Sequence, residues 1–473
     1  MSFASPLFLW YFMPAVLLVY WALPAKVRNA VLAISSLAFY AVGGGKFVLL
    51  LSTCMVINYL AGLGVDAPWA KARPRLRVAI LVGAVAADLS ILVYWKYAGF
   101  VSGQLHEVFQ AVPPLQVLLP IGISFFTFHH ISYVVDVYRG SRPAQRSPVQ
   151  FVTYIAMFPQ LVAGPIVRYH EISEQLAESR AGQRMADLAA GFPRFALGLA
   201  KKVIIADAVA PIANVVFSTP AGQLDWTTAW IGVIAYTIQI YFDFSGYSDM
   251  AIGLARMFGL RLPENFNRPY SAVSITDFWR RWHMSLSRWF RDYVYIPLGG
   301  NRGSTGSTYR NLFIVFVLTG VWHGANWTFL VWGLFHGGML AFERVTGLAK
   351  AEPGRWLIPR RILTLLLVMV GWVIFRAESL SQGLGIIRVL LVPDLATSTI
   401  LTDAGIRLQA ELLMVCALVV FALPADFTMG RYIEQARTRL AGVARVGFAA
   451  VAAPVAAVLV AAGTFSPFLY FQF

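Results

Sequence analysis

The sequence predicts an all-α, polytopic membrane protein, and three observations support this fold class. Hydrophobic residues make up 58% of the 473-residue chain and charged residues only 13%. Several apolar runs reach the roughly 20 residues that a helix needs to cross the hydrocarbon core of a bilayer. Lys and Arg gather in the short loops between these runs, as in the cytoplasmic loops of membrane proteins. We therefore expect a single membrane-embedded domain over residues 1–473.

The net charge of +15 is explained by the same loops. Basic loops of this kind face the cytoplasm and contact anionic headgroups, so we expect membrane lipids as partners and no nucleic acid. The two cysteines, Cys54 and Cys416, lie in apolar runs without metal-ligand spacing. We expect no cleavable signal peptide, because no basic residue precedes the first apolar run.

Counting the basic residues of each loop gives a topology with the N-terminus outside. The expected crossing helices cover 6–24, 30–43, 47–65, 78–97, 115–135, 195–217, 228–258, 362–376, 410–424 and 446–464. Residues 98–113 are expected to form an outside loop, and 261–310 a long polar segment on the cytoplasmic side. Residues 149–166 are short and interrupted by prolines, so we expect a re-entrant or interfacial segment there.

Residues 311–342 are apolar for most of their length but contain His323, Asn326 and His336. A continuous helix of this length would run about 48 Å, well beyond the roughly 30 Å hydrocarbon core. Basic loops lie at both ends, and glycines flank His323, so we expect a re-entrant stretch that breaks near this histidine. The alternative is a tilted helix with one satisfied histidine. Polar groups at membrane depth usually mark functional sites.

Residues 274–293 read as an interfacial amphipathic helix. Ser274 and Asp277 resemble a capping box at its start. Aromatic residues recur at helical spacing on one face, together with His283, and the other face is basic. The basic residues that define this second face are Arg280, Arg281, Arg288 and Arg291. They could bind lipid headgroups or the phosphates of a nucleotide-bearing donor. Asn326 is a further candidate for binding the donor.

Two carboxylates, Asp243 and Asp249, lie in the apolar run 228–258. Intramembrane carboxylates are functional candidates, but capping or pairing with a buried Arg is an equally good interpretation. His129 and His130 are adjacent and cannot share one helix face, so a metal site is weakly supported. We expect no metal and no bound cofactor.

The sequence lacks the motifs of other catalytic classes, including a G-x-S-x-G elbow, a P-loop and H-E-x-x-H. What remains is imidazole acting as a general base. A buried neutral histidine can take the proton of a hydroxyl while its oxygen attacks a thioester carbonyl. The chemistry that fits these residues is acyl transfer to an alcohol.

Five segments together resemble the membrane-bound O-acyltransferase family, and within it the bacterial alginate O-acetylation type. They are PIGISFFTFHHISYVVDVYRG (120–140), FPQLVAGPIVRYHEI (158–172), residues 241–303 with FWRRWHMSLSRWF, VWHGANWTFLVWGLFHG (321–337) and the terminal FSPFLYFQF. Residues 1–100 and 345–460 match only in hydropathy.

This resemblance implies a fold, a site and a setting. The fold is a ring of about ten or more helices around a thin centre, with a tunnel between the two membrane faces. The catalytic histidine corresponds to His323 and the second polar position to His283. The implied reaction carries an acetyl group, with acetyl-CoA as the expected donor, across the bacterial inner membrane. A separate periplasmic acetyltransferase would then modify an exopolysaccharide such as alginate.

The terminal stretch 465–473 fits F-x-Y-x-x-F around Tyr470. It resembles the C-terminal motif of the small acyl-relay peptide of teichoic-acid D-alanylation, which makes Tyr470 a possible acyl carrier on the outer face. A phenol suits this role, because its pKa near 10 makes it a better leaving group than a sugar hydroxyl. The alternative is an aromatic anchor at the membrane surface.

Other functions stay open at this point. Within the same family, the enzyme could transfer D-alanine or another acyl group to a cell-wall polymer. From a different class, it could be a transporter whose histidines relay protons or ions, or a scaffold of an export complex. Replacing His323 by Ala would distinguish these cases, because only the acyltransferase loses acyl transfer.

Overall fold

A computed structural model describes residues 2–177, 184–394, 399–406 and 439–463, with the isolated positions 409, 413, 420, 421, 468 and 469. Every regular element in these residues is a helix. The chain divides into two compact units. Unit 1 comprises Met1–Ala196 and Tyr247–Pro263, and unit 2 comprises Leu197–Gly246 and Glu264–Phe473.

Unit 1 begins with a π-helical turn, Phe8–Phe12, and continues as a series of helices. These are α1 (Met13–Ala22), α2 (Arg28–Gly44), α3 (Phe47–Asp66), α4 (Pro68–Lys71), α5 (Pro74–Val108), α6 (Ile123–Arg139), α7 (Pro148–Ala156), α8 (Phe158–Leu161), α9 (Tyr169–Ala177) and most of α10 (Arg184–Ala200). A short 3₁₀ turn, Ala25–Val27, precedes α2. The C-terminal part of α12 (Trp226–Met257) completes the unit.

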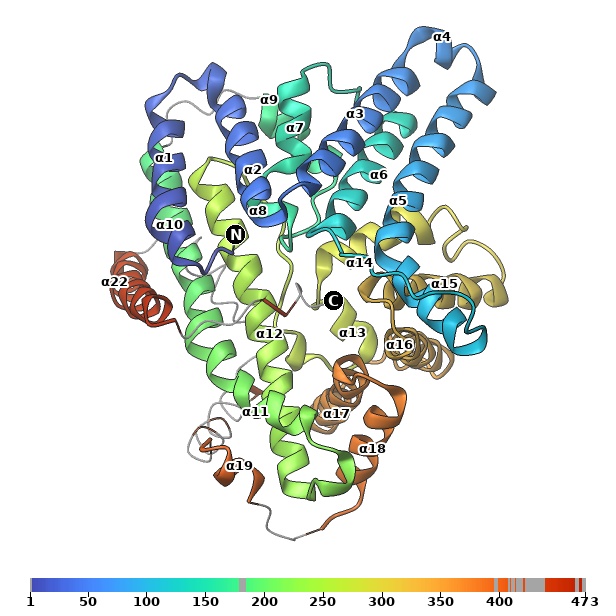
Figure 1. The fold of residues 1–473 in the computed structure, drawn as a ribbon, viewed down its shortest axis with the longest axis vertical. Coiled ribbons are helices and arrows are strands. Elements are labelled where there is room, and N and C mark those ends of the chain that lie inside the picture. The colour runs from blue at the N-terminus through green and yellow to red at the C-terminus, as the bar shows by residue number, and fades with distance from the viewer. Residues whose placement is uncertain are drawn as a thin grey trace. The chain divides into compact units, whose positions relative to one another are not determined.

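Helices α3, α5 and α6 of unit 1 lie side by side (Figure 1). A tight turn joins α2 to α3, with Gly45 in the left-handed region (φ 55°) that glycine adopts without steric cost. In α10 and α12 the guanidinium of Arg194 and the carboxylate of Asp249 form a buried ion pair of 2.6 Å. Pairing with a buried cation is therefore the environment that the structure gives Asp249.

Unit 2 continues from α10 through a π-helical segment, Lys201–Ala206, into α11 (Asp207–Ser218). Its other helices are the N-terminal part of α12, α13 (Ile275–Trp279), α14 (Met284–Phe290), α15 (Thr305–His323), α16 (Trp327–Val345), α17 (Leu357–Arg376), α18 (Leu380–Leu391), α19 (Ile400–Asp403) and α22 (Arg439–Ala461). Short turns of 3₁₀ or π type occur at Ala221–Gln223, Pro269–Ser271, Arg291–Tyr295 and Gly354–Trp356.

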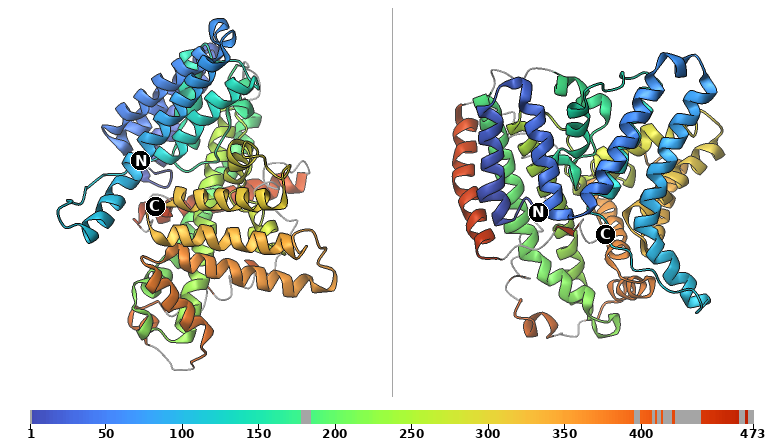
Figure 2. Two further views of the ribbon diagram at one scale, coloured as in Figure 1. Left: turned by 90° about the vertical axis from the view of Figure 1, so that its right-hand side faces the viewer. Right: turned by 45° about the horizontal axis from the view of Figure 1, so that its top comes forward.

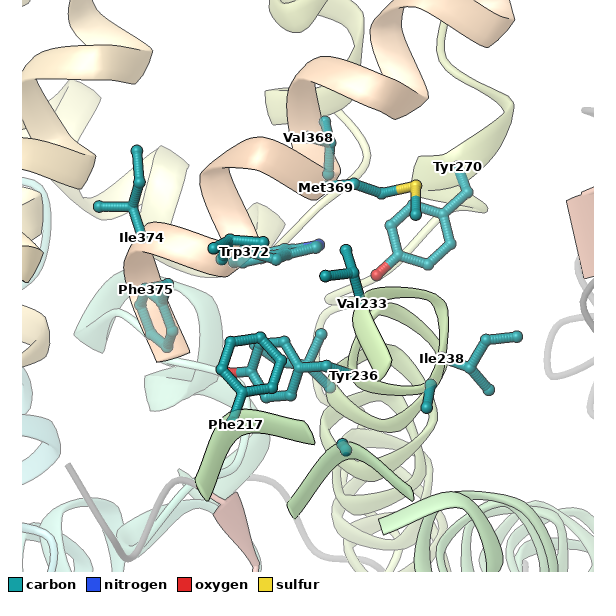
Figure 3. Close-up of a cluster of buried hydrophobic side chains, with 14 of the residues drawn as sticks. Phe217, Val233, Tyr236, Ile238, Tyr270, Val368, Met369, Trp372, Ile374 and Phe375 are labelled. Atoms are coloured by element: carbon teal, nitrogen blue, oxygen red, sulfur yellow. The ribbon is translucent and has the colours of Figure 1, made fainter. Parts of the chain in front are cut away.

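Helix α16 packs against α15 and against α17, and the three helices lie side by side (Figure 2). The apolar core of unit 2 combines aliphatic and aromatic side chains, many of them from α11, α12 and α17. Trp372 and Phe375 of α17 lie in this core together with Phe217 of α11 and Tyr236 of α12 (Figure 3). These buried rings stabilise the position of α17, because replacing one of them by Ala would leave a cavity and lower the free energy of unfolding by about 3–5 kcal/mol.

Four helices of the described chain are long and apolar enough to cross a membrane, judged by length and composition. They are Ala25–Gly44, Phe47–Asp66, Pro74–Val108 and Gly354–Arg376, all at or near predicted spans. Helix α5 is longer than predicted, because it continues to Val108 through most of the expected outside loop 98–113. Prediction and structure agree that 149–166 is interrupted, since α7 and α8 are separated at Met157.

Candidate active site

The stretch 311–342 forms two helices rather than one. Helix α15 ends at His323 and α16 begins at Trp327, so the chain breaks directly after the histidine, as the flanking glycines predict. The two helices meet where Gly320 of α15 lies against Gly333 of α16. A Cβ atom at Gly320 would stand 2.3 Å from the carbonyl oxygen of Phe329, so only glycine permits this approach. The backbone contact fixes His323, which lies one turn beyond Gly320.

His323 is buried, with 5% of its surface exposed, and aromatic rings surround it. The imidazole centroid lies 5.1 Å from the ring of Trp332 and 5.1 Å from that of Phe375, both in edge-to-face geometry. The ring of the preceding Trp322 lies at 4.9 Å. Such an environment excludes water and strengthens the electrostatic interactions of the imidazole with any substrate group beside it.

The loop after His323 is shaped by Gly324 and Asn326. A Cβ atom at Gly324 would overlap the ring of Phe329, so a larger residue there would require this ring to move. The side-chain oxygen of Asn326 accepts from the N–H of Thr328 and caps α16, a typical role for Asn at this position. Its amide nitrogen donates to the carbonyl of Glu378 at 3.0 Å. Asn326, predicted as a donor-binding residue, therefore has two structural bonds here.

Helix α13 is fixed to α16 at both of its ends. At its start, the buried carboxylate of Glu343 accepts from the backbone N–H groups of Ile275 and Thr276. At its end, the Nε1–H of Trp279 donates to Nδ1 of His336 at 3.3 Å. His336 is 1% exposed and was noted in the sequence without a role. The structure makes it a link between α13 and α16.

The amphipathic helix predicted over 274–293 is divided. Ser274 caps α13 as predicted, accepting from the N–H of Asp277 at 3.0 Å. The helix then ends at Trp279, and a new helix, α14, begins only at Met284. His283 lies at this break in the left-handed region (φ 43°, ψ 53°), which is uncommon for a residue with a side chain. A turn with no glycine gives no sequence signal, so periodicity predicted one helix.

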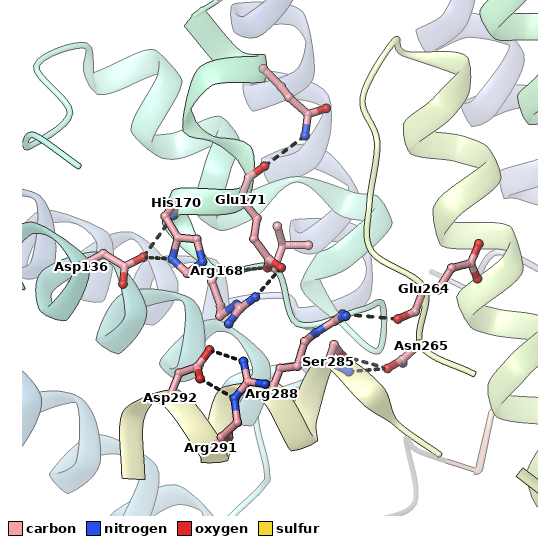
Figure 4. A network of polar contacts seen from close by, with 12 residues as sticks. Asp136, Arg168, His170, Glu171, Glu264, Asn265, Ser285, Arg288, Arg291 and Asp292 are labelled. Carbon is pink, nitrogen blue, oxygen red and sulfur yellow. Dashed lines mark hydrogen bonds and ion pairs between the residues drawn. The ribbon is translucent and has the colours of Figure 1, made fainter. Parts of the chain in front are cut away.

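His283 is completely buried, and its Nδ1 lies 3.1 Å from Oδ1 of Asn265. The same oxygen accepts from the backbone N–H and the hydroxyl of Ser285, a contact visible in Figure 4. The ring of Phe244 packs edge-to-face on the imidazole at 4.7 Å. Burial lowers the pKa of His283 to about 3, so the imidazole is neutral at cellular pH.

The two predicted catalytic histidines belong to one aromatic cluster of unit 2. The ring of Trp322 lies 6.2 Å from that of His283 and 4.9 Å from that of His323. On the other side of His323, Trp332 lies 4.9 Å from His336. The structure therefore brings His283 and His323 to the same tryptophan.

The predicted basic face does not form as one helical surface, because the break at residues 280–283 separates its members. Arg281 pairs with Asp277 at 2.9 Å, and Arg291 with Asp292 at 2.7 Å. Arg288 contacts the carbonyl oxygen of Glu264 at 3.4 Å (Figure 4). Arg280 is exposed. Acidic neighbours thus compensate two of the four arginines that were expected to meet a phosphorylated donor.

The other carboxylate of the apolar run, Asp243, lies in a buried ionic cluster of unit 2. Lys202 Nζ is 2.7 Å from Oδ1 of Asp243 and 2.6 Å from Oδ1 of Asp207. Oδ2 of Asp243 accepts from the backbone N–H of Leu469 at 2.8 Å. The ring of Phe468 lies 5.0 Å from the Lys202 ammonium, within reach of a cation–π interaction.

These contacts place part of the tail 465–473 inside the protein. Phe468 and Leu469 are buried, with 1% and 5% of their surfaces exposed. Tyr470 lies outside the described residues. In the described part of the chain, no group of three or more His, Cys, Asp or Glu side chains is arranged to hold a metal ion.

Sequence reasoning missed three parts of this site. Asn265 lies in a polar loop 18 residues before His283, and single-sequence patterns give no signal for such a contact. Trp322 and Trp332 count only as hydrophobic residues in a hydropathy pattern, and the pattern does not show that their rings surround His323. The charge of Lys202, close to the start of a predicted span, could have indicated the partner of Asp243.

Comparison with known proteins identifies the class. Residues 141–380 match the model of the membrane-bound O-acyltransferase family. The chain is 42% identical to the probable alginate O-acetylase AlgI of Azotobacter vinelandii, over 100% of both chains. It is 47% identical to the protein of that name from Pseudomonas aeruginosa, over 80% of this chain and 73% of the relative. The peptidoglycan O-acetyltransferase of Helicobacter pylori is 36% identical, over 82% of this chain and 79% of the relative.

The family model and these relatives together define the class of the chain as an acyltransferase. The chain belongs to the membrane-bound O-acyltransferase family. It is an acyltransferase and a membrane protein, which confirms the resemblance noted in the sequence. The transporter and scaffold hypotheses are therefore set aside.

Proposed function

We propose that this enzyme moves acetyl groups across the bacterial inner membrane for O-acetylation of an exopolysaccharide, with alginate as the polymer. The relatives named alginate O-acetylase, one of them aligned over the whole chain, support the acetyl group and the polymer. The observation that carries the chemistry is His323, buried at the end of α15 among Trp322, Trp332 and Phe375.

His323 acts as the general base of the transfer. Its neutral imidazole takes the proton of the attacking hydroxyl while the hydroxyl oxygen forms a bond to the thioester carbonyl carbon. The carbon–sulfur bond then breaks, and the departing thiolate receives the proton from the imidazolium. No metal or redox group takes part. The surrounding rings keep water away from the activated ester, which limits hydrolysis.

The donor, acetyl-CoA, enters from the cytoplasm near α13 and α14. Among the predicted arginines, the exposed Arg280 is the best placed to meet its phosphates, because Arg281 and Arg291 already pair with aspartates. In this proposal the helices form a multi-pass ring of about ten or more spans around a thin centre. The stretch 311–342 enters and leaves on the cytoplasmic side as a re-entrant pair of helices.

Tyr470 is the acyl carrier on the outer face. The phenol accepts the acetyl group with His323 as base, and a periplasmic acetyltransferase then moves the group to the polysaccharide. Support comes from the F-x-Y-x-x-F pattern and from the preceding residue, Leu469, whose N–H binds the carboxylate of Asp243. A phenyl ester remains activated enough for a second transfer.

The test is replacement of His323 by Ala in cells that secrete the polymer, with acetyl ester content measured by proton NMR. We expect loss of polymer acetylation at normal enzyme abundance, whereas His106→Ala, at the end of α5 in unit 1, should leave acetylation unchanged. Intact-mass analysis after exposure to donor should find acetyl on Tyr470 in the wild type and not in the His323 variant. Normal acetylation by Tyr470→Phe would exclude the relay and leave the base intact.

Peptidoglycan is a second candidate acceptor, favoured by the 36% identity to the Helicobacter pylori enzyme. The His323→Ala variant also distinguishes the two acceptors. If peptidoglycan is the acceptor, the variant loses acetyl esters from the isolated cell wall and not from the secreted polymer. The mass of the released acyl group separates acetyl from D-alanyl transfer.

A further inference from the structure

We infer that Asn265 is a positioning residue for His283, which it holds with the proton on Nδ1 and the lone pair on Nε2. This inference rests on the proposed function, in which His283 is the second histidine of the site. It concerns how the imidazole is prepared for that role. Three contacts to one atom, Oδ1 of Asn265, carry the argument.

The first step identifies that atom as an oxygen. Asparagine oxygen and nitrogen are assigned from their hydrogen-bond partners rather than seen directly. The backbone N–H of Ser285 can only donate, and it points to this atom at 3.1 Å. If this atom were the amide nitrogen of Asn265, its N–H groups would face the N–H of Ser285, and no hydrogen bond could form. The hydroxyl of Ser285 adds a second bond to the same atom at 2.9 Å.

The second step fixes the tautomer of His283. Nδ1 lies 3.1 Å from this oxygen, which has no hydrogen to give. The bond therefore exists only if Nδ1 carries the proton. In a neutral imidazole the other nitrogen, Nε2, then has the lone pair and can accept a proton or a hydrogen bond.

The third step concerns the orientation of the ring. His283 has a left-handed backbone conformation, which is unfavourable for a residue other than glycine and persists only where the surroundings impose it. Asn265 imposes it from two sides, because its backbone carbonyl also accepts from the N–H of Met284 at 2.9 Å. Phe244 covers the ring edge-to-face. The side chain of Asn265 thus binds the imidazole, and its backbone carbonyl fixes the turn that carries His283. Together they set the orientation of Nε2.

The direct test is ¹⁵N NMR of the full-length enzyme labelled at the histidine ring nitrogens, with the His283 signals assigned by their loss in His283→Gln. We expect a protonated Nδ1 and an unprotonated Nε2 in the wild type. Asn265→Leu should lose this pattern and lower kcat about 10–100-fold with the KM of the donor unchanged, as for other residues that orient a functional histidine. Asn265→Asp keeps the acceptor oxygen and should restore both.

Asn214→Leu is the matched control. It makes the same change at an exposed position of α11, where the amide oxygen accepts from Arg376 and not from a histidine, so tautomer and kcat should stay as in the wild type. A wild-type enzyme with the proton on Nε2 would overturn the inference, even if Asn265→Leu does not fold. So would an Asn265→Leu variant with unchanged tautomer and kcat. His283→Ala tests the proposed function separately: normal acetylation there would remove the role of His283 while the NMR result stands.

Discussion

The contact between α15 and α16 gives a prediction whose size follows from the coordinates. A Cβ atom added at Gly333 would stand 2.4 Å from the carbonyl oxygen of Phe316, about 1 Å closer than the 3.4 Å at which ordinary contact begins. The atoms nearest to this Cβ belong to the backbone of Phe316 and Gly320, so the helices must separate by about this distance. Overpacking of this kind costs about 1–3 kcal/mol. A displacement of about 1 Å at a catalytic group can cost about 100-fold in rate.

Gly333→Ala should therefore lower acetyl transfer by about 10–100-fold and lower the thermal unfolding temperature in detergent. The control is Gly338→Ala on the same helix, where an added Cβ would meet nothing within 4 Å. That variant should keep its activity and unfold at the same or a higher temperature, since Ala favours helix over Gly by up to about 1 kcal/mol. Wild-type rate and stability in Gly333→Ala would show that the helices do not approach as described.

Three further predictions concern buried polar contacts, and all are measured by thermal unfolding of the purified protein in detergent. Arg194→Met should destabilise unit 1 by about 3–5 kcal/mol because it removes the cation that pairs with the buried carboxylate of Asp249, and a second change, Asp249→Leu, should recover part of this loss. Glu343→Gln should cost about 1.5–3 kcal/mol, because a neutral amide replaces the carboxylate that binds the start of α13, and an unchanged midpoint would contradict the capping role. Leu469→Pro removes the N–H that binds Asp243 and should be less stable than Leu469→Val, which keeps it, by about 1–3 kcal/mol; equal midpoints would argue against that bond.

The parts of the site that were predictable from the sequence are those that local rules govern. The break after His323 follows from glycines within a stretch too long for one crossing, and the cap at Ser274 follows from residue type and spacing. The division at His283 was not predictable, because the spacing of the aromatic residues continues across it as if one helix were present. The left-handed turn depends on Asn265, which reaches His283 only in the folded chain.

The same distinction explains α5 and the arginines. Helix α5 extends through Gln104 and Glu107 because polar residues of good helix propensity do not end a helix, although they end an apolar run. Positive charge in 274–293 was counted correctly, but the compensation of Arg291 by Asp292 depends on side-chain geometry rather than on composition. Hydropathy and charge thus predicted the class of the protein, and long-range contacts decided the internal arrangement of the candidate site.

The bond between Leu469 and Asp243 joins residues 226 positions apart, which has a consequence for the order of assembly during synthesis. Lys202 and Asp243 enter the membrane early and can neutralise one another at once. Oδ2 of Asp243 has no bond to Leu469 until nearly half of the chain has been synthesised after it. Unsatisfied polar groups in hydrocarbon are costly. Pairings at such sequence separation form slowly. The folding of unit 2 is therefore completed late in synthesis. A chain that ends before residue 469 would contain the Lys202–Asp243 ion pair, but the site that Phe468 and Leu469 occupy would be exposed to lipid or to another protein.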